Sequence, residues 1–315
     1  MTSSQSARII SIIVCQCFFL SSASFAHPAS GIVVDAQGRV VFIYSKRGVM
    51  RIEASGKLTN IHENSGGHWL ALDRVGAFSN VTPKLFERIT PDGATPGLIF
   101  ASGGAPLVVG PDGGLYYGSS GLQQKSFPPG ANTVARLSSR GQQSLFAPLL
   151  QQALTNLKDG ITGLASGPDG SIYVATWNGI VKLRRDGSIA TILNPIAVKD
   201  CDSDPADHNP ANAASPLLRG LDVDTRGNLY VAATSCHRVL KISPDGKVTS
   251  ILKAERPYSP TGIAVSGDDI YILEYTNANG PATEGWYPRV RKLSKDHAVT
   301  TLATVPLKNS TPGIR

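Results

Sequence analysis

Ile161–Leu193 reads ITGLASGPDGSIYVATWNGIVKLRRDGSIATIL, and Leu218–Leu252 reads LRGLDVDTRGNLYVAATSCHRVLKISPDGKVTSIL. Each stretch contains four short apolar runs separated by two tight turns and one longer loop. The runs predict four antiparallel strands, because they are rich in β-branched and aromatic residues and the Gly-containing turns supply the positive φ of tight hairpins. Since one such unit cannot bury both of its faces, its recurrence along the chain predicts a propeller or solenoid.

The same pattern can be followed through six units, so the sequence predicts an all-β, six-bladed β-propeller with four antiparallel strands in each blade. The predicted blades are Gly31–Ile61, His68–Phe100, Pro106–Phe146, Ile161–Leu193, Leu218–Leu252 and Thr261–Leu302. The second blade is the weakest match, because its expected second strand, Ala77–Val81, is short and poor in apolar residues.

Residues 1–26 have the pattern of a secretory signal peptide, and residues 27–315 form the predicted propeller domain. Ile9–Leu20 is an apolar core, and Ser24-Phe25-Ala26 matches a small-x-small cleavage site before His27. The apolar core is too short to span a bilayer comfortably. We therefore expect a secreted or periplasmic protein, monomeric and without a membrane span after cleavage of the signal.

The charge of the chain argues against nucleic acid as a partner. The formal net charge is +7, and Arg8 is the only charged residue of the signal, so removing the signal leaves +6. The Lys and Arg residues are scattered over strand ends and turns, whereas a nucleic-acid-binding surface needs them gathered on one face. A small polar ligand, a peptide or an anionic envelope polymer is the expected partner.

Two cysteines remain after the signal, which contains Cys15 and Cys17, is removed. Cys201 lies in the loop before the fifth blade, and Cys236 lies between the second and third strands of that blade. Propeller topology puts both loops on one face, and export places them in an oxidising compartment. The sequence therefore predicts a disulfide, with two free thiols as the alternative.

Gly220–Val248 resembles an NHL repeat, in which G-x-A-V-D-x-x-G-N-x-Y-V-A-D is followed by N-H-R-V and a closing Asp-Gly hairpin. Thr162–Ala175 and Thr261–Leu273 fit the same pattern. The resemblance extends to the superfamily of six-bladed propellers that includes SMP-30/gluconolactonase-like enzymes, the peptidylglycine amidating lyase and strictosidine synthase-like proteins. It implies a shared architecture, whereas activities differ among these proteins, so function must be argued from the site.

The resemblance to gluconolactonase-like enzymes implies a divalent metal held by Glu, Asn and Asp side chains where the innermost strands begin. The matching positions of this chain are Ser30, His68, Ala105, Thr162, Arg219 and Thr261. None is a carboxylate or an amide, and an arginine repels a cation. The metal site of that family is therefore not expected at this ring.

Glu274 ends the second strand of the sixth blade and is expected to point toward the mouth of the central channel. With His68 and Arg219 it forms a predicted trio of ionisable groups. In an enzyme of the lactonase, hydrolase or lyase kind these three would be the catalytic residues, with an ionised Glu274 as ligand or base. The alternative is a structural ion pair between Arg219 and Glu274.

The insertions of the chain gather in one set of loops, and these loops emerge on one face of a propeller. They are Ser119–Asn132, Ala147–Gly160, Asn194–Leu217 and Tyr275–Pro288. This face is the predicted binding face. The candidate ligand-binding residues mix aromatics, amides and hydroxyls, which suits a polar ligand with an apolar face; they are Tyr275, Asn277, Asn279, Trp286, Tyr287, Thr162 and Thr261. The alternative is a loop that packs on itself.

One inserted loop is acidic, and it supplies the candidate metal ligands Asp202, Asp204, Asp207 and His208. Hard cations such as Ca²⁺ bind several oxygens of this kind, and Zn²⁺ is the other candidate. The spacing does not match an EF-hand, and a solvated loop with Asx-turns is the alternative. Because the ring lacks metal ligands, the sequence favours a binding module over an enzyme.

Overall fold

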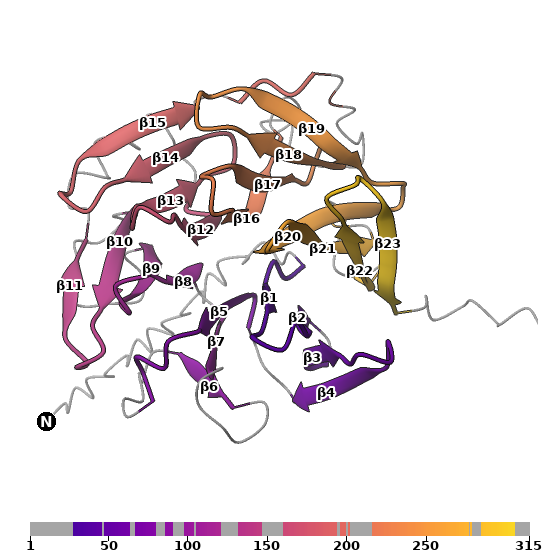
Figure 1. Cartoon of the computed structure of the whole chain (residues 1–315), viewed down its shortest axis with the longest axis horizontal. Coiled ribbons are helices and arrows are strands. Elements are labelled where there is room, and N and C mark those ends of the chain that lie inside the picture. The colour runs from indigo at the N-terminus through magenta and orange to yellow at the C-terminus, as the bar shows by residue number, and fades with distance from the viewer. Residues whose placement is uncertain are drawn as a thin grey trace, which may run out of the picture.

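The computed structural model describes residues 28–45, 47–63, 67–79, 86–90, 98–103, 105–120, 132–146, 160–193, 196–199, 201, 216–276, 278 and 285–305. Figure 1 shows six β-sheets arranged around a central axis, each with its first strand innermost. Five sheets have four antiparallel strands, and the described part of the other has three. The predicted six-bladed, all-β propeller is confirmed.

The four-stranded blades are built from consecutive strands. Blade 1 contains β1 (Ile32–Val34), β2 (Val40–Tyr44), β3 (Gly48–Ile52) and β4 (Leu58–His62). Blade 3 contains β8 (Leu107–Val109), β9 (Leu115–Ser120), β10 (Asn132–Leu137) and β11 (Gln143–Leu145). Blade 4 contains β12 (Gly163–Ser166), β13 (Ile172–Ala175), β14 (Ile180–Leu183) and β15 (Ile189–Leu193).

Blades 5 and 6 follow the same plan with longer strands. Blade 5 contains β16 (Leu218–Val223), β17 (Leu229–Ala233), β18 (Arg238–Ile242) and β19 (Val248–Lys253). Blade 6 contains β20 (Tyr258–Ser266), β21 (Asp269–Thr276), β22 (Pro288–Leu293) and β23 (Val299–Thr304). Gly170 and Gly246 have φ values of 78° and 84°, which confirms the expected positive φ in the Gly-containing hairpin turns.

Blade 2 differs from the sequence-based expectation. Its strands β5 (Trp69–Asp73), β6 (Glu87–Ile89) and β7 (Leu98–Ser102) pair in the order β5-β7-β6. The expected second strand at Ala77–Val81 is wrong, because Ala77, Phe78 and Ser79 lie in turns. The Asp73 carboxylate accepts hydrogen bonds from the backbone N–H groups of Ala77 and Phe78 at 3.1 and 2.8 Å, and this fixes the turn.

Glycines bring neighbouring innermost strands into backbone contact around the axis. A Cβ added at Gly31 would lie 2.8 Å from the amide nitrogen of Leu70, and one at Gly220 would lie 2.6 Å from the Cα of Gly262. A Cβ at Gly262 would overlap the carbonyl oxygen of Ser30. Only a residue without a side chain fits at such positions, so blade 6 closes directly on blade 1.

Apolar side chains fill the spaces between adjacent blades. Tyr275 of β21 is fully buried between blades 6 and 1, where its hydroxyl donates a hydrogen bond to the carbonyl oxygen of Ile43. Burial raises the pKa of the Tyr275 hydroxyl, which therefore stays protonated as a donor. In the part of the chain that the structure describes, no helix is long and apolar enough to cross a membrane.

Candidate functional site

The two ends of the axis differ, and we name them after their connections. The loop end is where the innermost strands begin and where the insertions of the sequence emerge. The turn end is where the innermost strands finish at the short hairpins. The sequence-predicted ring lies at the loop end, and the residues found below it on the axis lie toward the turn end.

The backbone of His68 is held firmly at the loop end, just before β5. Its N–H donates to the carbonyl oxygen of Ser102 at 2.7 Å, and its own carbonyl accepts from the N–H groups of Ser30 and Gly31, each at 2.8 Å. The imidazole is half-buried beside the indole of Trp69, with ring centroids 5.6 Å apart. These contacts fix the position of His68 between blades 1 and 2.

Arg219 reaches the same end of the axis from blade 5. The pairing of β16 with β17 shifts between Leu218 and Leu221, and this bulge contains Arg219. Bulges of this kind re-aim side chains. Arg219 Nη1 donates to the carbonyl oxygen of Pro28, in the segment before β1, at 3.4 Å.

The electrostatics of His68 depend on this placement. Burial lowers the pKa of the His68 imidazole, and the positive charge of Arg219 lowers it further. His68 is therefore neutral at pH 7, whereas Arg219 keeps its charge. Of the predicted trio, His68 and Arg219 lie close enough for the charge of Arg219 to act on the imidazole.

Two threonines of the ring have different surroundings. Thr261 lies at a bulge of β20 and donates from its hydroxyl to the carbonyl oxygen of Ala29 at 2.8 Å. The Thr162 hydroxyl is buried and has no hydrogen-bond partner among the described residues. The Thr162 carbonyl oxygen accepts from the indole Nε1 of Trp69 at 3.4 Å. Thr261 is thus occupied in closing the ring, whereas the Thr162 hydroxyl is buried without a partner among the described residues.

Glu274 does not join the predicted trio. Its carboxylate is fully buried and accepts hydrogen bonds from Arg289 Nε at 2.7 Å and from Arg291. Both arginines belong to β22, and Arg289 is the cross-strand partner of Glu274. The expected Arg219–Glu274 pair is therefore corrected: Glu274 is held inside blade 6, and both of its carboxylate oxygens are occupied.

The candidate ligand-binding residues near blade 6 lie mainly in the core. Tyr275 is buried, which corrects its expected role as a ligand contact: alternation along β21 turns this ring into the space between blades. Trp286 packs in the same cluster at 7% exposure. Tyr287 is partly exposed, and its backbone N–H donates to the hydroxyl of Thr276 at 3.1 Å. Asn277 and Asn279 lie outside the described residues.

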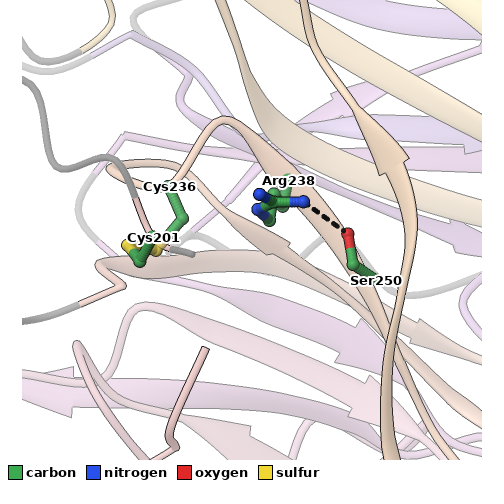
Figure 2. The surroundings of a disulfide bond; sticks show 4 residues. All are labelled: Cys201, Cys236, Arg238 and Ser250. Carbon is green, nitrogen blue, oxygen red and sulfur yellow. Dashed lines mark hydrogen bonds between the residues drawn. A yellow bond between two sulfur atoms is a disulfide. The ribbon is translucent and has the colours of Figure 1, made fainter. Parts of the chain in front are cut away.

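The predicted disulfide is present, as Figure 2 shows. Cys201 and Cys236 are joined with their Cα atoms 4.7 Å apart, so the chain entering blade 5 is tied to the loop between β17 and β18. Beside it, Arg238 Nη1 donates to the Ser250 hydroxyl at 3.3 Å. The bond confirms that these two loops lie on the same face.

The candidate metal ligands of the acidic loop lie outside the described residues and remain a prediction; they are Asp202, Asp204, Asp207 and His208. Within the described ranges, no group of three or more His, Cys, Asp or Glu side chains is placed to hold a metal ion. The ring at the loop end presents an imidazole beside a guanidinium. That donor set does not fit the divalent metal that the gluconolactonase resemblance implies, and no step is derived through one.

A cavity of about 470 Å³ runs along the axis toward the turn end. All six innermost strands line it, so its walls are strand backbone and mostly apolar side chains. At one level of this lining, five blades contribute small or medium apolar residues, namely Val33, Ala71, Val108, Ala165 and Ala264. Blade 5 contributes Asp222 at the equivalent position.

Asp222 is a functional candidate that sequence reasoning missed. One carboxylate oxygen accepts from the backbone N–H of Val265 at 2.7 Å, and the other accepts from Val223 at 2.9 Å. Burial raises the pKa of Asp222 to about 6, although these hydrogen bonds and the charge of Arg74 act in the opposite direction. The available signal was an Asp at the alanine position of the G-x-A-V-D pattern.

No protein-family model matches the sequence, and a search of curated proteins finds no relative. Several solved structures resemble the fold. A putative gluconolactonase is 16% identical over 89% of this chain and 92% of its own, with a TM-score of 0.52. Luciferin-regenerating enzyme is 16% identical over 90% of this chain and 96% of its own, with a TM-score of 0.53.

A third similar structure is a catalytically inactive virginiamycin B lyase from Staphylococcus aureus with quinupristin. It is 15% identical over 91% of this chain and 87% of its own, with a TM-score of 0.50. Identities this low establish the architecture and leave the activity open. The chain is a six-bladed β-propeller whose structure matches propellers of the SMP-30/gluconolactonase and virginiamycin B lyase kind.

Proposed function

We propose that this protein is an enzyme of the hydrolase or lyase kind that acts on a small, polar, anionic substrate at the loop end of the axis. The observation that carries the proposal is the meeting of His68 and Arg219. A neutral imidazole and a permanent cation lie together where all six blades converge, and His68 is only half-buried. This pairing suits general-base catalysis on a substrate that gains negative charge.

The roles follow from the protonation states. The neutral His68 imidazole accepts a proton, either from a carbon next to a carbonyl group or from an attacking water. Arg219 binds the oxygen on which negative charge develops, and burial strengthens this interaction because water is excluded. Both elimination and ester or lactone hydrolysis begin with this proton transfer.

The comparisons support an enzyme rather than a passive scaffold. Solved structures that share the fold are described as a lyase, a luciferin-regenerating enzyme and a putative gluconolactonase. The activities in these descriptions differ, so they favour an enzyme and name no substrate for this chain.

The test is an activity screen on small anionic lactones and esters, with acid release followed by a pH indicator. His68→Gln and Arg219→Gln should each lower kcat/KM by about 100-fold or more. His62→Gln is the matched control, because His62 lies on β4, the outermost strand of blade 1, and pairs with Glu87 at 2.6 Å. It should retain full activity.

The pH profile separates a catalytic His68 from a structural one. Because its pKa lies below the ordinary value, activity should persist as the pH falls through the usual histidine range and decline only below it. Retention of activity in both axis variants would contradict the proposal, as would a pH profile that His68→Gln leaves unchanged.

A second candidate function is a binding module for a small polar ligand, a peptide or an envelope polymer. It is favoured by the four insertions of the sequence, which all belong to connections at the loop end. Saturable binding without turnover, weakened by Tyr287→Ala but not by His68→Gln, would support this module.

We also propose that the protein is exported, so the recovered mature chain should begin at His27; retention of residues 1–26 would contradict export.

A further inference from the structure

The lining of the axial cavity contains charged residues that are not part of the loop-end site. The cavity lining begins at Ser30, Gly31, Gly163 and Gly220, where the innermost strands start. Below this level the cavity lining continues to the ends of the innermost strands, including Val75, Pro111, Pro168 and Gly267. The cavity therefore runs along the innermost strands as far as the turn end, and neither His68 nor Arg219 is part of its lining.

Two ionisable side chains of opposite sign remain available in this lining. Asp222 accepts one backbone hydrogen bond on each carboxylate oxygen, which leaves a lone pair of each oxygen for a ligand. Arg74 follows β5 at the turn end and is exposed. Arg74 lies close enough to influence Asp222 electrostatically, yet among the described residues the two form no ion pair.

The third ionisable residue in the lining, Asp224, is already occupied. Its carboxylate accepts from the side chains of Asn228 at 2.7 Å, Tyr230 at 3.1 Å and Arg226 at 3.3 Å, and from backbone N–H groups of the same turn. Asp224 thus stabilises the β16–β17 hairpin. The charged side chains of the cavity that remain available to a ligand are those of Asp222 and Arg74.

The rest of the cavity is suited to an apolar body. The residues level with Asp222 in the other blades are valines and alanines, so Asp222 is a lone polar anchor in an apolar ring. Each innermost strand is also the edge of its sheet, and its outward backbone groups face the axis as further donors and acceptors. Apolar walls with a few placed polar groups are typical of small-molecule sites, and the volume lies in their range.

We propose that the turn end of the axial cavity binds a small zwitterion, with its ammonium group on Asp222 and its carboxylate on Arg74. An α-amino acid with an apolar side chain is the simplest ligand of this class. Its ammonium and carboxylate groups are complementary to Asp222 and Arg74, and its side chain lies against the ring of valines and alanines. The ion pair with Asp222 adds specificity because the Asp222 carboxylate is desolvated and its charge is penalised when it has no counter-ion.

The test is isothermal titration calorimetry with three ligands of one shape. L-phenylalanine has both charges, phenethylamine lacks the carboxylate, and 3-phenylpropionate lacks the ammonium group. L-phenylalanine should bind at one saturable site, and each of the other two should bind about tenfold more weakly or worse. Equal affinity for all three would overturn the proposal, as would the absence of saturable binding by L-phenylalanine.

Matched variants show which residue binds the ammonium group of the ligand and which binds its carboxylate. Asp222→Asn keeps the shape and the acceptor for Val265, and it should weaken L-phenylalanine by about tenfold while leaving 3-phenylpropionate unchanged. Arg74→Gln should weaken L-phenylalanine similarly and leave phenethylamine unchanged. Asp245→Asn and Arg140→Gln are controls on exposed hairpin turns at the same end, outside the cavity lining. Equal losses in the controls, or no loss in the two cavity variants, would overturn the proposal.

Discussion

Gly220 of β16 faces Gly262 of β20 so closely that a Cβ at position 220 would lie 2.6 Å from the Cα of Gly262. The same Cβ would lie 2.8 Å from the carbonyl oxygen of Thr261, so backbone surrounds it and cannot move aside independently. Blades 5 and 6 therefore pack at the axis without intervening side chains.

Gly220→Ala should lower the free energy of unfolding by about 1–3 kcal/mol, because the added methyl group forces two innermost strands apart. Urea unfolding followed by circular dichroism measures this change. Gly160→Ala is the control, since a Cβ there meets no atom within 4 Å. A Gly220→Ala variant as stable as the control would show that the strands separate at no cost.

Glu274→Gln should destabilise the fold. The carboxylate lies between Arg289 and Arg291, and removing its charge leaves two guanidinium groups buried without a counter-ion. Breaking such a group costs about 3–5 kcal/mol. Urea unfolding measures the loss, and Glu53→Gln, which removes a partly exposed ion pair with Arg51, should change stability little. An unchanged unfolding free energy would return Glu274 to the list of catalytic candidates.

Asp222 should make stability fall as the pH rises. Its pKa is about 6 in the folded chain against 3.8 ordinarily, so between these values the folded state binds more protons than the unfolded state. The stability that protonated Asp222 contributes is complete below about pH 4 and is lost as the pH rises through about 6. Arg74 is the charged group that opposes this effect.

Asp222→Asn should therefore be more stable than the unmodified protein at pH 7, by up to about 3 kcal/mol, and nearly equal to it at about pH 4. Urea unfolding at both pH values measures the difference. Asp245→Asn serves as the control, because the Asp245 pKa is lowered by its hydrogen bond from Ser243 and its contribution is lost in the opposite direction, as the pH falls. A constant difference at both pH values would contradict the raised pKa.

Reduction of the disulfide should destabilise blade 5. Cys201 and Cys236 are 35 residues apart in the sequence, and a cross-link over a loop of this length contributes about 2–4 kcal/mol. The thermal midpoint should fall when a phosphine reductant is added. The double variant Cys201→Ser, Cys236→Ser should start from the lower midpoint and show no response to the reductant; a response there would point to another cause.

The sequence repeat was enough to predict the propeller, because the strands and turns of each hairpin are determined by residues close together in the sequence. Turn glycines and alternating strands define each hairpin, and blades 4, 5 and 6 carry them without interruption. Blade 2 was misread for the same reason. Asp73 binds the chain that follows it into a turn, and the strand beside β5 comes from Leu98–Ser102, which lies further along the sequence.

The site was harder to predict because it depends on contacts between blades. Counting along the first strands placed His68 and Arg219 at one end of the axis, which the structure bears out. The same counting could not show that Glu274 turns to Arg289 on the next strand, since that choice is made by side-chain packing within the sheet. Asp222 can be found from the sequence only by aligning the first strands of all six blades, because it is the charged residue at a position where the other blades have Val or Ala.

Each described sheet consists of strands that follow one another along the chain, and the closing of blade 6 on blade 1 joins segments from opposite ends of the sequence. During synthesis, every blade can form as soon as its own strands leave the ribosome. The joint at Ser30, Thr261 and Gly262 must wait for nearly the whole chain. The nascent protein is thus an open arc of finished blades, and its axial cavity comes into existence only with the final turn of the ring.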